Sequence, residues 1–378
     1  MTSHHKHRSM PRPRLISGLL SDPRRWVDAL VVFVPVALIL AFLRADSTAI
    51  FITAALGIIP LAGILGEATD ALATRAGTRA GALLNATFGN AAELIITITA
   101  IRAGLLNVVK ASITGSIIGN ILLVLGLSVL AGGLRHGFQR FGRGGVSVSM
   151  TMMTIAIIGL LVPAVFASAI ASSSRVNVEY LSLGVAAALM IAYVLSLLFS
   201  FTALAKKERV APLAPEPEEE GLPDWSVRRA LIVLVAAVVF IAWLSEILVA
   251  AIEPVILERG LTELFVGVIV VPIIGNAAEH LVAMQMALKN KMDVALEIAL
   301  GSSTQVALFV GPLLVFISLA FGTPMSLVFN PFELAALVAS VVIAALISLD
   351  GESNWLEGAQ LLIVYIILAL AFFYLPVA

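Results

Sequence analysis

The sequence contains the five-residue stretch GNAAE twice, at residues 89–93 and 275–279, so the second copy lies 186 residues after the first. The same shift relates the dipeptide GS at residues 115–116 to GS at residues 301–302. One match of five residues can arise by chance, but a second match at an unchanged shift indicates an internal duplication. The chain is therefore predicted to consist of two related halves.

The amino-acid composition indicates whether these halves fold in water or in a membrane. Of the 378 residues, 60% are hydrophobic and 12% are charged. Soluble domains carry about 25% charged residues, so this chain has too few to cover a water-exposed surface. A helix needs about 20 mostly apolar residues to cross a bilayer. We therefore predict an all-α integral membrane protein with eleven transmembrane helices, at residues 27–43, 48–74, 80–102, 106–131, 146–167, 178–204, 227–252, 261–288, 292–320, 331–348 and 356–376.

The duplication also predicts the domain organisation. We expect a basic tail, a first transmembrane helix, a first repeat of five helices, an acidic and proline-rich linker, and a second repeat of five helices, at residues 1–25, 26–45, 46–204, 205–226 and 227–378. Because five is an odd number, the second repeat starts on the opposite side of the membrane from the first. The two repeats are therefore predicted to be inverted, and their interface near the midplane is the expected substrate site.

The distribution of Lys and Arg predicts the orientation. With a cytoplasmic N-terminus, the cytoplasmic side holds the basic tail, the linker lysines and most loop arginines. The opposite side then holds only Arg44, Arg102, Lys110, Arg175 and Arg259. Cytoplasmic loops carry the excess of positive residues, so we expect a multi-pass protein of the inner cell membrane with its N-terminus in the cytoplasm.

Each GNAAE motif places a glutamate, Glu93 or Glu279, inside a predicted span. An ionisable residue there is costly and indicates a functional site by default. A protonated Glu that only hydrogen-bonds a neighbouring helix is the alternative, and its occurrence at two equivalent positions argues against it. Asn90 and Asn276 precede the two glutamates by three residues and share their helix faces. Two carboxylates with neutral oxygens suit Ca²⁺, which takes about 6–8 oxygen ligands.

Polar residues on the next helix of each repeat are candidates to complete this cation site. Ser116 and Ser302 offer hydroxyls, and Gln305 lies about one turn after Ser302. Serine in a membrane helix also serves as a packing contact, so packing and cation binding are both open. His280 follows Glu279, where a neutral imidazole can relay protons, and a structural hydrogen bond is equally consistent.

Three further acids are candidates for the cation path. Glu67 and Glu246 lie early in the two repeats, on long predicted helices. Glu297 has no counterpart in the first repeat. It is either an entry residue or a helix-end glutamate whose charge reaches the interface.

The number of charges predicts coupling to protons. Ca²⁺ carries two positive charges and the two glutamates carry two negative ones, so protons are expected to replace Ca²⁺ in the empty site. If the protein changes between its inward-facing and outward-facing conformations only when the site is neutral, exchange of Ca²⁺ for H⁺ follows. The alternatives are an exchanger of Na⁺, K⁺ or Mn²⁺ for H⁺, and a passive channel with a glutamate-lined filter.

Other classes of function find little support. The chain has no Cys, which excludes disulfides and thiolate metal sites, and it has no GxSxG or HExxH motif. We therefore expect no enzymatic activity and no cofactor. The expected partners are Ca²⁺, H⁺ and the lipid bilayer, with no nucleic acid, and a homo-oligomer is left open.

The motifs resemble those of the Ca²⁺/cation antiporter superfamily, and specifically of its Ca²⁺/H⁺ exchanger branch. The resemblance rests on ATFGNAAELI, GSIIGNILLVLG, PIIGNAAEH and GSSTQVALFVGP, at residues 86–95, 115–126, 272–280 and 301–312. It implies the exchanger fold and Ca²⁺ binding by Glu93 and Glu279. It also implies pore-lining roles for Asn90, Ser116, Asn276, His280, Ser302 and Gln305, with Glu67 and Glu246 as peripheral path acids.

Overall fold

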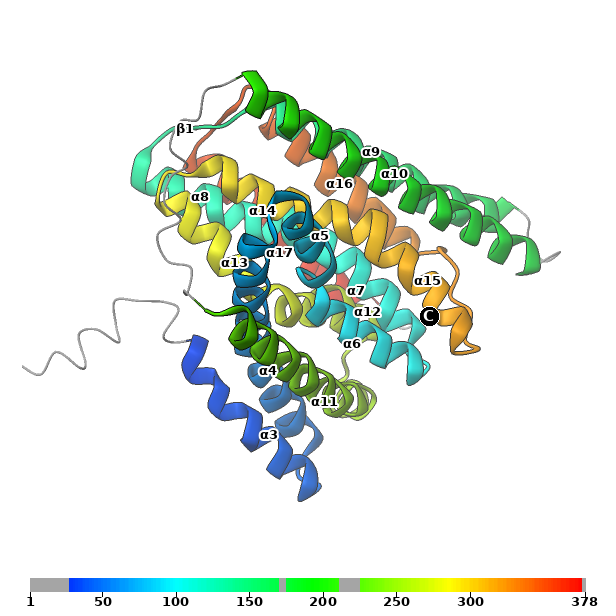
Figure 1. Ribbon diagram of the computed structural model, residues 1–378. Helices are drawn as coiled ribbons and strands as arrows, with labels where there is room; N and C mark the ends of the chain where they lie inside the picture. Colours follow the sequence, from blue (N-terminus) through cyan, green and yellow to red (C-terminus); the bar gives the residue numbers. More distant parts are fainter. Residues whose placement is uncertain (1–26, 170–174, 211–224, 376–378) are drawn as a thin grey trace, which may run out of the picture.

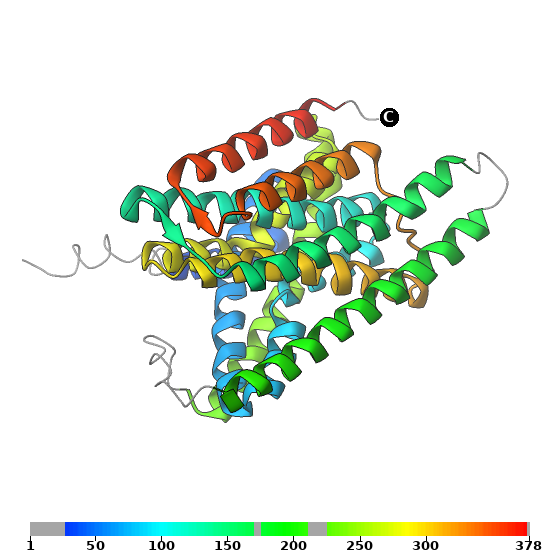
Figure 2. The same cartoon turned by 90° about the horizontal axis from the view of Figure 1, so that it is seen from above.

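The computed structural model describes residues 27–169, 175–210 and 225–375. The predicted basic tail lies outside the described residues, as does most of the predicted linker. The described part is almost entirely helical (Figures 1 and 2). Its N-terminal half comprises η1 (Leu30–Val32), α3 (Phe33–Phe42), α4 (Ser47–Ala76), α5 (Thr78–Phe88), α6 (Ala91–Arg102), α7 (Leu106–Ile118), η2 (Gly119–Val124), α8 (Leu125–His136), α9 (Arg143–Ala169) and α10 (Arg175–Val210).

The C-terminal half has a similar series of helices. It comprises α11 (Val227–Arg259), α12 (Glu263–Phe265), η3 (Val266–Val270), α13 (Val271–Leu288), α14 (Met292–Gln305), η4 (Val306–Val310), α15 (Gly311–Ala320), α16 (Pro331–Ile347) and α17 (Trp355–Tyr374). The segments η2, η3 and η4 are π-helical turns that continue directly into α-helices. Such turns are rare and occur often at functional sites.

Membrane-spanning helices dominate the described residues. Eight are long and apolar enough to cross a membrane: Ser47–Ala76, Leu106–His136, Arg143–Ala169, Asn177–Thr202, Val227–Arg259, Glu263–Leu288, Met292–Ala320 and Trp355–Tyr374. Two shorter apolar helices cover Val27–Phe42 and Pro331–Ile347. The prediction of a helical, multi-pass membrane protein is therefore confirmed.

Three details differ from the sequence-based prediction. A continuous helix over residues 80–102 is wrong, because the chain turns at Gly89 and Asn90 and separates α5 from α6. Helix α10 continues to Val210, beyond its expected end at residue 204. The fold also contains two short strands, β1 (Gln139–Arg140) and β2 (Glu352–Ser353), which pair antiparallel.

Local signals in the sequence explain where several helices begin and end. Asn330 and Asn354 begin α16 and α17 with capping boxes, in which the side chain of the third helical residue, Glu333 or Glu357, bonds back to the cap. Gly260 ends α11 in the left-handed conformation that glycine adopts without strain. Between these signals, long runs of apolar residues leave the helices to be fixed by tertiary packing.

The first long helices of the two halves, α4 and α11, pack against each other, and α13 packs against both α4 and α8. The span Leu106–His136 is the most deeply buried. By contrast, α9 and α10 form a long pair at one edge of the bundle (Figures 1 and 2). Their outer faces expose large apolar side chains such as Ile158, Val162 and Leu198. This distribution is that of a core surrounded by lipid-facing helices.

Candidate cation-binding site

The turn at Gly89 and Asn90 places Glu93 in the first turn of α6 rather than in the middle of a longer helix. Ala91, Ala92 and Glu93 are all buried, so the start of α6 lies inside the protein. The first N–H groups of a helix have no intrahelical partners, and the helix dipole is positive at this end. A carboxylate in this turn is therefore electrostatically favoured, which sequence periodicity alone did not predict.

Glu93 is held by residues from both halves of the chain. It is 4% exposed. Its Oε1 accepts hydrogen bonds from Ser116 Oγ on α7 and from Asn276 Nδ2 on α13. Asn276 Nδ2 also lies 3.4 Å from Ser116 Oγ. The other carboxyl oxygen, Oε2, is buried without a hydrogen-bond partner among the described residues, which leaves it available to a cation or a proton.

Glu279 lies on α13, three residues after Asn276, and is partly exposed. Its Oε2 is buried and has no hydrogen-bond partner in the described part of the chain. The carboxyl group is close enough to Glu93 and to Ser302 to interact electrostatically with both. The structure thus brings the two predicted glutamates together, each beside the serine of its own repeat.

A second group of hydrogen bonds surrounds Ser302. Its Oγ donates to Asn90 Oδ1 over 3.1 Å and accepts from Asn120 Nδ2 over 3.0 Å. A serine has one hydroxyl proton, and Ser302 donates it to Asn90. Asn120, which was not among the predicted site residues, lies in η2. Its spacing of four residues after Ser116 is the signal that could have identified it.

The two π-helical turns η2 and η4 occupy nearly equivalent places in the two halves. The shift of 186 residues maps η2 (Gly119–Val124) onto residues 305–310, and η4 covers Val306–Val310. Gln305 directly precedes η4. Its Oε1 lies 3.9 Å from the position that a Cβ on Gly89 would take, so Gln305 adjoins the turn between α5 and α6.

The remaining predicted residues differ in how far their side chains are exposed. His280 is partly exposed next to Glu279, and Glu67 is partly exposed on α4. Glu297 is exposed on α14. Glu246 is exposed on α11 and forms an ion pair with Arg102 over 3.6 Å. The exposure of Glu246 and Glu297 separates them from the buried groups that surround Glu93.

Sequence reasoning missed a second buried acid. Glu333 on α16 is 3% exposed, and its Oε1 accepts a hydrogen bond of 2.7 Å from Thr114. Nearby, Lys110 Nζ donates to the carbonyl of Val328 over 3.0 Å. Glu333 also caps α16, so the Asn-x-x-Glu pattern before an apolar run was the signal that could have found it. We interpret this cluster as structural.

The donor set of the site consists of oxygen atoms. Within the described ranges, no cluster of three or more His, Cys, Asp or Glu residues could hold a metal ion. The candidate ligands are the two carboxylates together with neutral oxygens of Asn and Ser side chains. This combination suits a hard cation such as Ca²⁺ and does not suit a soft metal.

Gly275 provides a test of how tightly the site is packed. A Cβ on Gly275 would lie 2.7 Å from Glu93 Cγ, so Gly275→Ala should displace the Glu93 side chain without removing its charge. We expect about a tenfold weaker apparent Ca²⁺ affinity, as when a group that orients a metal ligand is lost. Ca²⁺ titration of the purified protein measures this affinity.

Gly63→Ala is the matched control for this variant. A Cβ on Gly63 would lie 3.8 Å from Ala278 Cβ, which is an ordinary contact between α4 and α13. We expect its Ca²⁺ affinity to equal that of the wild type. Equal affinities for Gly275→Ala and Gly63→Ala would contradict the close approach of Gly275 to Glu93.

Comparison with known proteins identifies the family to which the chain belongs. A family model described as sodium/calcium exchanger protein matches residues 46–202 and 229–374, close to the predicted repeats. The Ca(2+)/H(+) antiporter of Aphanothece halophytica is 45% identical over 363 residues, covering 92% of this chain and 96% of that protein. The Ca(2+)/H(+) antiporter ChaA of Bacillus subtilis is 44% identical over 344 residues, covering 90% and 97%.

Solved structures agree with the sequence comparisons. The structure of native YfkE is 41% identical and superposes with a TM-score of 0.80, covering 92% of this chain and 100% of that chain. A second structure of YfkE is described as that of a Ca²⁺/H⁺ antiporter protein. The H⁺/Ca²⁺ exchanger CAX, at 14% identity and a TM-score of 0.68, shares the fold. With both halves of the chain matched by the family model and with relatives aligned along most of its length, this protein belongs to the sodium/calcium exchanger protein family.

Proposed function

We propose that the protein is a secondary active antiporter that exchanges Ca²⁺ for H⁺. The observation that carries this proposal is the contact between the two halves at Glu93, whose buried Oε1 accepts a hydrogen bond from Asn276, three residues before Glu279. The relatives that are 44–45% identical over most of their length are named Ca(2+)/H(+) antiporters. Since those relatives are transporters, no enzymatic reaction is proposed.

Charge balance explains the exchange. A Ca²⁺ ion neutralises the two carboxylates, and two protons are the other way of neutralising them. Both use the same oxygens, including the Oε2 atoms of Glu93 and Glu279 that have no hydrogen-bond partner among the described residues. Occupation by Ca²⁺ and by protons is therefore mutually exclusive. A site that keeps an uncompensated charge makes the change between the two conformations costly, and this cost couples the two fluxes.

For the architecture, we propose one N-terminal helix (residues 26–45) followed by two inverted repeats of five transmembrane helices. The repeats are residues 46–204 and 227–378. The two segments matched by the family model support this division. Alternating access then consists of helix movements around a fixed site at the repeat interface. The interruption between α5 and α6 at Gly89 and Asn90 supports such movement, because discontinuous helices commonly form transporter sites.

The proposed location is the inner cell membrane, with the N-terminal tail (1–25) and the linker (205–226) in the cytoplasm. The distribution of Lys and Arg supports this orientation. In this arrangement Glu67 lies toward the cytoplasmic end of α4 and Glu246 toward the outer part of α11. We propose that these two acids line the paths on opposite sides of the site, while Gln305 and His280 adjoin the site itself.

Purified protein in lipid vesicles tests the function. With an imposed proton gradient, we expect uptake of radioactive Ca²⁺ against its own gradient, and a proton ionophore should abolish this uptake. A passive channel would only equilibrate Ca²⁺. Competition by Na⁺, K⁺ and Mn²⁺ separates Ca²⁺/H⁺ exchange from the alternative exchangers. Uptake that is unaffected by the proton gradient would contradict the proposal.

A further inference from the structure

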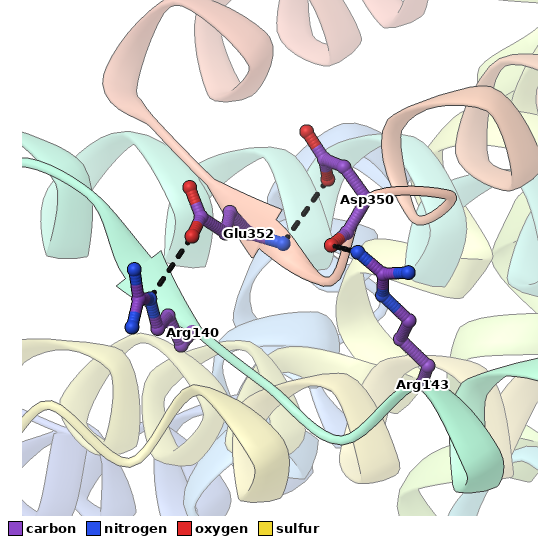
Figure 3. A network of polar contacts seen from close by, with 4 residues as sticks. All are labelled: Arg140, Arg143, Asp350 and Glu352. Atoms are coloured by element: carbon purple, nitrogen blue, oxygen red, sulfur yellow. Dashed lines mark hydrogen bonds and ion pairs between the residues drawn. The ribbon is translucent and has the colours of Figure 1, made fainter.

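Three turns that are far apart in the sequence meet at one end of the helix bundle. They are residues 136–143 between α8 and α9, residues 287–293 between α13 and α14, and residues 350–353 between α16 and α17. We call this group the clasp. Strand β1 pairs with β2, Arg140 Nε bonds Glu352 Oε1 over 2.9 Å, and the Arg143 guanidinium donates to the Asp350 carbonyl (Figure 3). The clasp thus joins a turn of the first half to two turns of the second.

Gln139 is the buried centre of the clasp. It is 1% exposed although it lies in a turn. Its Nε2 donates to Ala287 O over 3.0 Å and to Asn290 Oδ1 over 2.9 Å. His136 Nε2 lies 2.8 Å from the carbonyl of Leu288. Ala287 and Leu288 are the last residues of α13, where helix carbonyls lack intrahelical donors. The first half of the chain therefore caps the helix that carries Asn276 and Glu279.

The packing around Gln139 leaves little room for movement. Gly132 on α8 faces it, and a Cβ at Gly132 would lie 1.9 Å from Gln139 Oε1 and 3.2 Å from Ala287 Cβ. Gly132 thus allows the Gln139 side chain to fit between α8 and α13. Any side chain at position 132 must displace the Gln139 amide from this position.

A displacement of the end of α13 would also displace Glu279 in the candidate cation site. Glu279 and Ala287 are eight residues apart on one continuous helix, which corresponds to about 12 Å along its axis. No Gly or Pro lies between them to absorb a shift. Glu279 is therefore connected to the C-terminal end of α13 by continuous helix.

We propose that Gln139 is a positioning residue for Ca²⁺ binding: it fixes the end of α13 and thereby the depth at which Glu279 meets Glu93. This inference deepens the proposed function and rests on its cation site. Gln139 does not touch the cation. It acts through the helix that carries a cation-binding carboxylate, as do the groups that orient metal ligands in other proteins.

Two variants disturb the same contact in different ways. Gln139→Met keeps the approximate volume and removes both hydrogen bonds, whereas Gly132→Ala keeps Gln139 and displaces it. In vesicles, both should raise the half-saturating Ca²⁺ concentration by about tenfold, within the range that loss of a ligand's partner produces. The maximal rate at saturating Ca²⁺ should stay within about twofold of the wild type, since the carboxylates remain intact.

Arg140→Gln is the control from the same clasp. It removes an ion pair whose Arg side chain is 85% exposed, and such pairs contribute little. We expect its half-saturating concentration to be unchanged. A merely structural role of Gln139 would instead lower the amount of folded protein and the maximal rate, without changing half-saturation. If Gln139→Met or Gly132→Ala folds and its half-saturating Ca²⁺ concentration equals that of the wild type, the inference is overturned.

Equilibrium binding of radioactive Ca²⁺ to the detergent-purified proteins separates this inference from the proposed function. If the wild type binds Ca²⁺ but shows no proton-driven uptake, the proposed exchange fails. The comparison of binding between the wild type, Gln139→Met and Gly132→Ala then still decides the role of Gln139.

Discussion

Replacing either Glu93 or Glu279 with Gln is expected to abolish proton-driven Ca²⁺ uptake. Glutamine has nearly the same shape, so the variants remove one negative charge and one exchangeable proton with little change in packing. A divalent cation would then face a single carboxylate in a buried site. An uncompensated buried charge costs about 3 kcal/mol or more, which corresponds to more than a hundredfold loss of affinity. Uptake in vesicles and Ca²⁺ binding in detergent both measure this loss.

Glu258→Gln is a suitable control, because Glu258 is an exposed glutamate near the end of α11. Its uptake should equal that of the wild type. Thermal melting in detergent should show that both site variants fold, since Oε2 of each glutamate has no hydrogen-bond partner among the described residues. Full uptake by Glu93→Gln and by Glu279→Gln would refute the assignment of the site.

The duplication makes the candidate site recognisable in the sequence, because the same motif occurs in both halves. A glutamate that recurs at an equivalent intramembrane position identifies both partners before any contact is known. Helical spacing correctly placed Asn276 on the face of α13 that carries Glu279. It did not predict that Asn276 would bond Glu93 of the other half, because periodicity describes one helix and not the pairing between helices.

The turn between α5 and α6 shows a different limit. GNAAE is identical in the two halves, yet the chain is interrupted at Gly89 and Asn90 and continuous through Gly275 and Asn276. Identical local sequences have identical intrinsic propensities, so tertiary surroundings must decide between the two conformations. Tertiary surroundings also decide the contacts of the clasp. Gln139 donates a hydrogen bond to Ala287, which lies 148 residues further along the chain.

Gly115→Ala is expected to be strongly destabilising, whereas the equivalent Gly301→Ala should be tolerated. A Cβ on Gly115 would lie 2.2 Å from the carbonyl oxygen of Val268, because α7 packs directly on the backbone of η3. Backbone cannot move aside as a flexible side chain does. We expect a loss of at least about 3 kcal/mol, above the usual cost of overpacking, and little folded protein. Yield and thermal melting in detergent measure this effect.

Gly301→Ala is the control for Gly115→Ala, because it makes the same substitution without the close contact to backbone. A Cβ on Gly301 would meet no atom within 4 Å. Alanine is favoured over glycine inside a helix by about 0.5–1 kcal/mol, so Gly301→Ala should melt at or slightly above the wild-type temperature. Because both variants replace a glycine before a site serine with alanine, a difference between them reports the contact of α7 with η3. Equal melting temperatures would mean that the two halves do not pack as described. Ser116 would then no longer be fixed beside Glu93 by the contact of its helix with the backbone of the second half.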